Sequence, residues 1–177
     1  VPGCSQFAIT ARRNGGEGMI HGANEDWSLA LVLTQTLKRV VQVRRPAKGI
    51  PHVMFSICGQ LGGINGMNQS GLAVSRTLLL DRMSREKLPS GWIHTILVRQ
   101  ILEQATDLDS AIEIVRRCER TGAWSLCVSH AASDQLCYLE YDGTSLQVRT
   151  GEERERADVQ CVRVVAAQDV RGFGELR

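Results

Sequence analysis

The sequence lacks the short motifs that mark most metal and phosphate sites. It contains no HExxH helix, no Cys-x-x-Cys pair and no GxxxxGKS/T loop. These absences exclude the commonest zinc patterns and a Walker-type phosphate loop. The histidines show no ligand spacing, and we expect strand or helix-surface residues rather than catalysts at His21, His52, His94 and His130.

Strong charge of one sign and long hydrophobic runs are also missing. The 21 basic and 19 acidic residues leave a net charge of +2, which gives no reason to expect a nucleic-acid partner. No apolar run reaches the length of a membrane span, and the first residues lack the basic-then-apolar order of a secretory signal. We therefore expect a cytoplasmic protein with neither a nucleic-acid nor a membrane partner.

Cysteine is present, but in no zinc-binding pattern. An even number permits disulfides, yet a chain of 177 residues can build a core without them. We expect the thiols to be mostly reduced, with those in strands packed as small apolar side chains. The six positions are Cys4, Cys58, Cys118, Cys127, Cys137 and Cys161, of which Cys127 and Cys137 lie in expected strands.

The composition is sufficient for one core, since 43% of the residues are hydrophobic. No repeat, low-complexity tract or linker divides the chain. The sequence predicts a single domain over residues 1–177, and it leaves open whether that domain is excised from a longer chain.

Elements are expected in the order strands, two helices, strands. β-Branched and aromatic runs predict strands at 4–10, 19–27, 30–45, 52–59, 72–80, 123–133, 135–143, 144–150 and 159–167. Apolar residues at helical spacing predict helices over 92–105 and 107–122. This order favours an α+β fold in which two largely antiparallel sheets stack and the helices cover one face.

Local signals mark the turns and helix ends. Asn14-Gly15 predicts a hairpin, and the glycine-rich stretch 59–71 predicts a tight turn. Asp109 is the expected N-cap of the second helix, and Gly122 its expected stop. The apolar side of the first helix is expected to consist of Ile93, Ile96, Leu97, Ile101 and Leu102.

Four stretches in this order carry a resemblance to a known family: "GCSQFA", "HGANEDW", "GGINGMNQSGLAV" and "LPSGWIHTILVRQILEQATDLDSAIEIV". Together they resemble the penicillin acyltransferase-like (acyl-coenzyme A:6-aminopenicillanic acid acyltransferase) family of N-terminal nucleophile hydrolases. That family is similar to choloylglycine hydrolases. The resemblance implies a four-layer αββα sandwich and activation by self-cleavage between Gly3 and Cys4. It also implies that no metal or organic cofactor is needed.

The chemistry of Cys4 suits that implication. Its thiol can attack the carbonyl of Gly3, which has no Cβ and tolerates a strained backbone. Cleavage would free the α-amine of Cys4, whose ordinary pKa of about 7.7–8.0 lies close to the value of about 8.5 for a thiol. The amine can then act as the general base for its own side chain. The alternative is that Cys4 is a buried structural thiol.

Other site residues follow from the resemblance. Asp26 matches a carboxylate that holds the nucleophile's amine, and Asn24 could brace the site; the alternative is an ordinary strand end. Choloylglycine hydrolases carry an arginine where this chain has Ala23, so a contact made by that arginine is in doubt. Where the family has an asparagine that completes the oxyanion hole after the last strand, this chain offers only Gln168.

The strand after the glycine-rich stretch carries the remaining candidates. Backbone N–H groups at Thr77 or Leu78 are expected to form half of an oxyanion hole, although the stretch also reads as a simple hairpin. Arg76 is a candidate for a substrate carboxylate, with a solvated arginine as the alternative. Trp27 could line an acyl pocket or belong to the core.

The predicted function is acyl transfer or hydrolysis at an amide or thioester of a small-molecule substrate. Acyl-coenzyme A and carrier-bound acyl groups are among the candidate donors, and a homodimer is compatible with the sequence. The alternative is a non-catalytic domain that keeps the fold and serves assembly in a multidomain biosynthetic enzyme. A papain-type protease is disfavoured, because no histidine stands in a fitting context.

Overall fold

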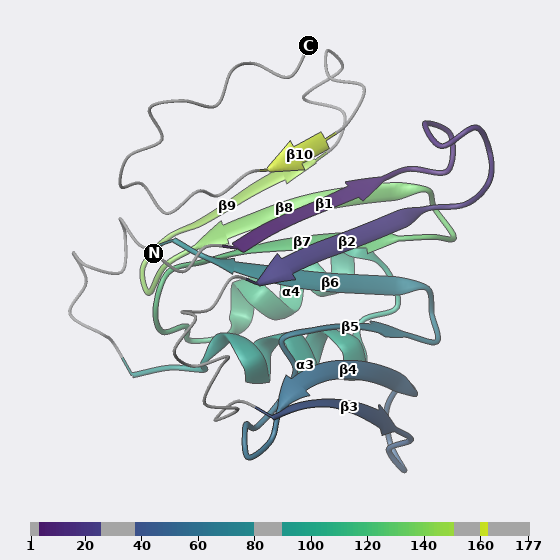
Figure 1. Cartoon of the computed structure of the whole chain (residues 1–177). Coiled ribbons are helices and arrows are strands. Elements are labelled where there is room, and N and C mark those ends of the chain that lie inside the picture. The colour runs from purple at the N-terminus through teal and green to yellow at the C-terminus, as the bar shows by residue number, and fades with distance from the viewer. Residues whose placement is uncertain (1–3, 26–37, 80–89, 151–159, 163–177) are drawn as a thin grey trace.

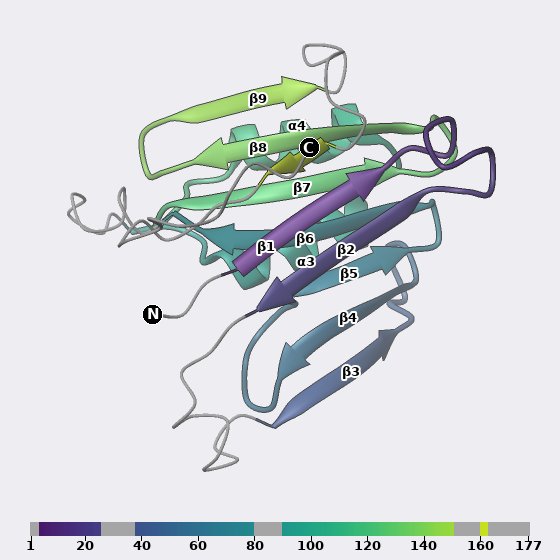
Figure 2. The same cartoon turned by 45° about the horizontal axis from the view of Figure 1, so that its top comes forward.

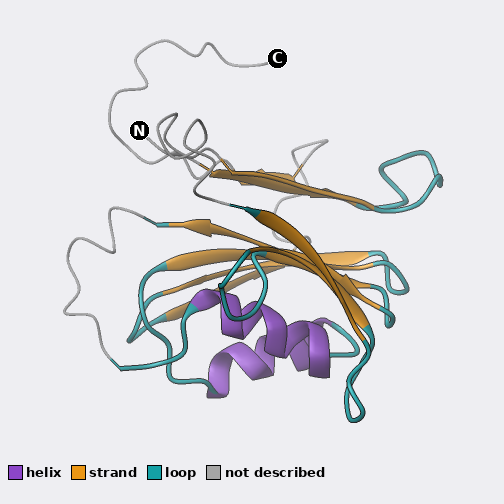
Figure 3. Cartoon of the chain, turned by 60° about the horizontal axis from the view of Figure 1, so that its bottom comes forward, coloured by secondary structure: helices purple, strands orange, loops and turns teal. Residues whose placement is uncertain are grey.

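Two antiparallel sheets lie face to face, and two helices cover the outer face of the larger sheet (Figures 1 and 3). The computed structural model describes residues 4–25, 38–79, 90–150 and 160–162. Four candidates from the sequence fall outside these ranges: Gly3, Asp26, Trp27 and Gln168. The α+β class and the stacked sheets expected from the order of elements are confirmed.

The larger sheet has seven strands in the order β3-β4-β5-β6-β7-β8-β9. Their bounds are β3 Arg39–Arg44, β4 His52–Ile57, β5 Asn65–Asn68, β6 Leu72–Leu78, β7 Trp124–His130, β8 Gln135–Tyr141 and β9 Leu146–Thr150. The smaller sheet has the order β10-β1-β2. Its bounds are β1 Cys4–Ile9, β2 Ile20–Glu25 and β10 Gln160–Val162.

Strand β5 was not expected, because its sequence lies in the glycine-rich stretch. Its glycine has a packing reason: a Cβ on Gly66 would lie 2.4 Å from the carbonyl oxygen of Val53 and 2.6 Å from a methyl carbon of Leu102. Only glycine therefore lets this strand sit between its neighbour and the helix beneath it.

The main apolar core fills the space between the seven-stranded sheet and the helices α3 (His94–Gln104) and α4 (Leu108–Arg117). The buried face of α3 differs from the expected one. Ile93 is 43% exposed and is the N-cap residue rather than part of the apolar side. The buried side chains of α3 are Thr95, Leu97, Val98, Ile101 and Leu102.

The expected ends of α4 were wrong. The N-cap is Asp107, whose carboxylate accepts a hydrogen bond from the Ser110 N–H at 2.8 Å in a reciprocal capping box, whereas Asp109 lies in the first turn. The helix ends at Arg117 with Cys118 as C-cap, four residues before Gly122. Gly122 instead takes a positive φ of 75° just before β7.

The layer between the two sheets is small and largely polar. Among the described residues, its buried apolar cluster has four members: Ala8, Cys127, Leu136 and Tyr138. Beside them lie fully or almost fully buried polar side chains from both sheets: Gln6, Ser75, Ser125 and Ser129. The smaller sheet is therefore held to the larger one by polar contacts as much as by apolar burial.

The smaller sheet covers only part of the larger one. β1 contacts β6 and β7, and β2 contacts β6, so the same face of β3–β5 stays open (Figure 2). Exposed apolar side chains stand on that open face, including Val41 (60% exposed), Phe55 (54%) and Met67 (56%). In the described part of the chain, no helix is long and apolar enough to cross a membrane.

The corrected helix cap can be tested by a matched pair of variants. Asp107→Ala should lower the free energy of unfolding, because the first N–H groups of α4 lose their acceptor. Asp109→Ala removes a similar carboxylate that accepts no capping bond, and should cost less than half as much. Urea unfolding of both variants checks this, and equal effects would contradict the assignment.

Candidate active site

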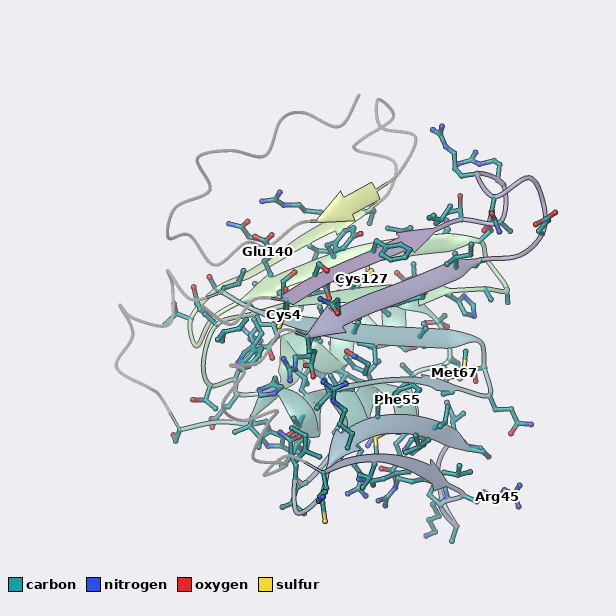
Figure 4. All side chains as sticks on the ribbon, in the orientation of Figure 1. Cys4, Arg45, Phe55, Met67, Cys127 and Glu140 are labelled. Carbon is teal, nitrogen blue, oxygen red and sulfur yellow. The ribbon has the colours of Figure 1, made fainter. Side chains whose placement is uncertain are left out.

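Cys4 is the first residue of β1, the middle strand of the smaller sheet (Figure 4). It is a reduced thiol of intermediate burial. Two other thiols differ from it: Cys127, between the sheets, and Cys137, in the helix-facing core, are fully buried, as expected, and burial raises the pKa of both, that of Cys137 to about 12. Cys4 is therefore better suited to nucleophilic chemistry than these two buried thiols.

The contacts of Gln6 with the larger sheet place Cys4 near the end of β6. Two residues further along β1, Gln6 bonds to Ser75 of β6 and to Ser125 of β7. β1 and β6 run in opposite directions (Figures 1 and 2). Going back from Gln6 to Cys4 therefore corresponds to going forward along β6, from Ser75 toward Thr77 and Leu78.

At that end, β6 separates from its neighbour β5. Their pairing covers only Gly66 opposite Val74 and Met67 opposite Ala73. Beyond this pairing, the N–H of Arg76 donates to the side-chain oxygen of Asn65 at 3.3 Å and not to a backbone carbonyl of β5. We call the place bounded by Asn65, Arg76 and Leu78 the β5–β6 fork.

The two expected oxyanion donors differ in this geometry. The N–H of Leu79 donates to the carbonyl of Ala123 at 3.0 Å, on the β7 side. Because N–H directions alternate along a strand, the N–H of Thr77 also points to β7, where Thr77 faces Ser125 in the ladder. The N–H of Leu78 points the other way, with that of Arg76, into the fork. No strand of the described chain pairs with β6 there.

The side chain of Thr77 faces the layer between the sheets. It is fully buried, and its hydroxyl has no hydrogen-bond partner among the described residues. Thr77 shares this face of β6 with Ser75. Leaving a buried hydroxyl without a partner costs free energy. A bound molecule that accepts a hydrogen bond from Thr77 would remove that cost.

Arg76 is not solvated, which corrects one of the two expected readings. It is 4% exposed, and its Nη2 lies 2.6 Å from Oε1 of Glu25. The guanidinium also lies 5.1 Å from the centre of the Trp124 ring, within range of a cation–π contact. The substrate-binding role of Arg76 stays a prediction.

Glu25 is the site residue that sequence reasoning missed. It pairs directly with Cys4 across β1 and β2, so the two side chains share one face of the sheet. Asn24 pairs with Ser5 and belongs to the opposite face by strand alternation. The sequence shows an acidic residue between Asn24 and Asp26, but only the strand register shows that Glu25 faces Cys4.

His21 joins the two sheets through buried hydroxyls. Its Nδ1 lies 2.7 Å from Oγ of Ser129, and its Nε2 lies 2.8 Å from Oγ of Ser75. Burial lowers the pKa of His21 to about 4, so the ring is neutral near pH 7. The expectation that His21 is an ordinary strand residue missed this network, because nothing in the sequence pairs His21 with two distant serines.

A groove of about 1010 Å³ runs beside the smaller sheet and over the open face of β3–β5. Glu25, His21 and Ser75 line one side of it, and Phe55 and Met67 lie on its apolar floor. The groove thus connects the surroundings of Cys4 with exposed apolar surface. Within the described ranges, no group of three or more His, Cys, Asp or Glu side chains could hold a metal ion.

Two buried histidines predict a fall in stability at acidic pH. The pKa of His21 is lowered from 6.5 to about 4 by burial, and that of His94 to about 3 by burial and the nearby Arg76. Below pH 6.5 these histidines therefore bind protons in the unfolded chain but stay neutral in the folded protein. Stability is full above pH 6.5 and is lost as the pH falls toward 4, by up to about 3 kcal/mol for His21.

Urea unfolding at a series of pH values measures this effect. The His21→Gln variant should show a shallower fall between pH 6.5 and 4 than the unchanged protein, whatever its stability at neutral pH. Equal slopes for the two proteins would show that His21 does not titrate as described.

Comparison with known proteins agrees with the fold and the order of motifs. The family model for acyl-coenzyme A:6-aminopenicillanic acid acyl-transferase matches residues 13–160. A Caenorhabditis elegans N-acylethanolamine-hydrolyzing acid amidase ortholog is 14% identical with a TM-score of 0.57, over 83% of this chain and 63% of that one. A mutant conjugated bile acid hydrolase from Clostridium perfringens is 12% identical with a TM-score of 0.60, over 84% of this chain and 51% of that one. The comparison with curated protein sequences finds no match.

At these identities the two structures show a shared fold, and this chain spans less than two thirds of either. Both have the N-terminal nucleophile hydrolase fold, which confirms the predicted sandwich. Three of its four layers, one of helices and two of strands, lie in the described residues. Because the family model covers most of the sequence, the chain belongs to the acyl-coenzyme A:6-aminopenicillanic acid acyltransferase family.

Proposed function

We propose that the protein catalyses acyl transfer or hydrolysis at an amide or thioester, with Cys4 as the nucleophile. The observation that carries the proposal is the meeting of three features at one end of β1. The partly buried thiol of Cys4 lies there, Glu25 stands opposite it, and β6 turns the N–H of Leu78 into the β5–β6 fork. A nucleophile beside an N–H outside the strand ladder is the arrangement that acyl chemistry needs.

Activation would begin with the bond between Gly3 and Cys4. The thiol of Cys4 attacks the carbonyl carbon of Gly3, and the peptide nitrogen leaves as the α-amine of Cys4, so that a thioester replaces the amide. Water then cleaves the thioester, which releases the Gly3 carboxylate and restores the thiol. The nucleophile and its base are then held together by the covalent geometry of one residue.

The acyl-transfer cycle would use the same atoms. The α-amine accepts the thiol proton as sulfur attacks the substrate carbonyl, and returns it to the leaving amine or thiol. The N–H of Leu78 stabilises the oxyanion, and the hydroxyl of Thr77, which has no hydrogen-bond partner in the described part of the chain, is a second donor. Water or an acceptor amine opens the resulting thioester. The amide of Gln168 is proposed to complete the hole.

Charged residues would hold the nucleophile in place. Asp26 is proposed to orient the α-amine of Cys4. Glu25 and Arg76 form the fixed ion pair beside the fork, and the positive charge of Arg76 there favours a developing oxyanion or a substrate carboxylate.

The proposed substrate is a small molecule with an acyl group, such as an acyl-coenzyme A or another acyl thioester or amide. The family name supports this class. The groove beside Glu25 offers apolar side chains against which an acyl chain can pack. Trp27 is a further candidate for that surface, and a cytoplasmic location remains part of the proposal.

Mass spectrometry of the purified protein tests the role of Cys4. The protein should lose Val1–Gly3 and, when incubated with a panel of acyl thioesters and amides, gain one acyl group on Cys4. Cys4→Ala should show neither change, while Cys58→Ala, which removes an exposed thiol, should show both. An intact N-terminus and no adduct from any panel member would favour the non-catalytic domain.

A proline pair separates the two backbone donors. Leu78→Pro removes an N–H that no described strand accepts, so the protein should fold while acyl-adduct formation falls by about 10²–10³-fold. Thr77→Pro removes an N–H of the β6–β7 ladder and should prevent folding. Circular dichroism and the rate of adduct formation check both. A folded Leu78→Pro variant with an unchanged rate would exclude Leu78 as the oxyanion donor.

A further inference from the structure

Four buried polar side chains and the partly buried ring of His21 form one continuous hydrogen-bond chain between the sheets. Their contacts run from Ser129 through His21, Ser75 and Gln6 to Ser125 at distances of 2.7, 2.8, 3.0 and 3.1 Å. Gln6, Ser75, Ser125 and Ser129 are at most 1% exposed. We call this the inter-sheet chain.

The inter-sheet chain has a defined direction. The hydroxyl of Ser75 donates to Oε1 of Gln6, and a hydroxyl has a single proton to give. Ser75 must therefore accept from His21, whose proton is on Nε2. Nδ1 of His21 then accepts from Ser129, and Nε2 of Gln6 donates to both the hydroxyl and the carbonyl of Ser125. A neutral imidazole therefore satisfies both contacts of the His21 ring.

The inter-sheet chain connects the two sheets next to the reaction site. Gln6 shares its face of β1 with Cys4, two residues away. Its partner Ser75 lies two residues before Thr77 on β6, and its partner Ser125 is the cross-strand neighbour of Thr77. Gln6 thus ties the strand of the nucleophile to β6, which carries the proposed oxyanion donors, and to its neighbour β7.

We propose that the inter-sheet chain, with Gln6 at its centre, fixes the position of Cys4 relative to the Leu78 N–H, so that Gln6, Ser75 and His21 are positioning residues for the acyl chemistry. This inference rests on the proposed function. Among the described residues, the buried apolar cluster between the sheets has four members: Ala8, Cys127, Leu136 and Tyr138. Apolar contacts of this small cluster hinder a sliding movement of β1 over β6 only weakly. Directional hydrogen bonds hinder it strongly.

The test compares two reactions of the same thiol. Acylation of Cys4 needs the oxyanion donors, whereas alkylation by iodoacetamide displaces iodide and needs none. Loss of positioning should therefore slow acylation by about 10- to 100-fold and leave the alkylation rate within about twofold. Both rates are measured at Cys4 by peptide mass mapping on Gln6→Leu and Ser75→Ala, at temperatures where near-ultraviolet circular dichroism shows native packing.

Tyr141→Phe is the matched control. Tyr141 is a fully buried residue of the seven-stranded sheet, but it belongs to the core on the helix-facing side, and its hydroxyl has no hydrogen-bond partner among the described residues. It should keep both rates unchanged. If Ser75→Ala does not fold, Ser129→Ala, at the far end of the inter-sheet chain, takes its place.

The outcomes separate the two proposals. Slow acylation with normal alkylation in the chain variants alone supports positioning. Unchanged acylation, or acylation and alkylation that fall together, overturns it and leaves the proposed function intact. An unchanged protein that is alkylated at Cys4 but acylated by no panel member overturns the proposed function, and this inference with it.

Discussion

The alternation of strand β6 is the constraint on which the rest of the structure depends. One face of β6 packs Leu72 and Val74 against the helices, and the other presents Ser75 and Thr77 to the smaller sheet. Along its edges, N–H groups point by turns to β7 and to β5. Because β5 pairs with only the first part of β6, the N–H of Leu78 lies outside the ladder of the described strands, at the end of β6 that lies near Cys4.

Polar contacts between the sheets give this arrangement its rigidity. A sandwich held by apolar side chains alone tolerates small shifts, since hydrophobic contact is not directional. Here the buried amide of Gln6 and the imidazole of His21 each have defined partners on the opposite sheet. The ion pair between Arg76 and Glu25 adds a further link, from β6 to the strand beside Cys4. The same contacts that join the sheets therefore also define the geometry of the site.

Many of the strands and helices could be predicted from the sequence, because hydrophobic periodicity and turn residues are local signals that neighbouring positions carry. The strands around Cys127 and the second helix were found this way, and the order of motifs pointed to Cys4. Strand β5 was missed because Gly66 was taken as part of a turn. The glycine is there because Leu102 packs closely against it. Glu25, Arg76 and His21 were misjudged because their partners lie far away in the sequence, and only the register of two stacked sheets brings them together.

The most direct test of the central geometry follows the backbone amides while Cys4 is modified. Protein labelled with nitrogen-15 is treated with iodoacetamide, and amide chemical shifts are compared before and after alkylation of Cys4, with the Cys4→Ala variant as the blank. The structure predicts a large shift for the N–H of Leu78, which points into the fork, and a smaller one for Thr77, which is held in the ladder. An unmoved Leu78 amide, with shifts confined to β10 and the outer face of β1, would contradict the account.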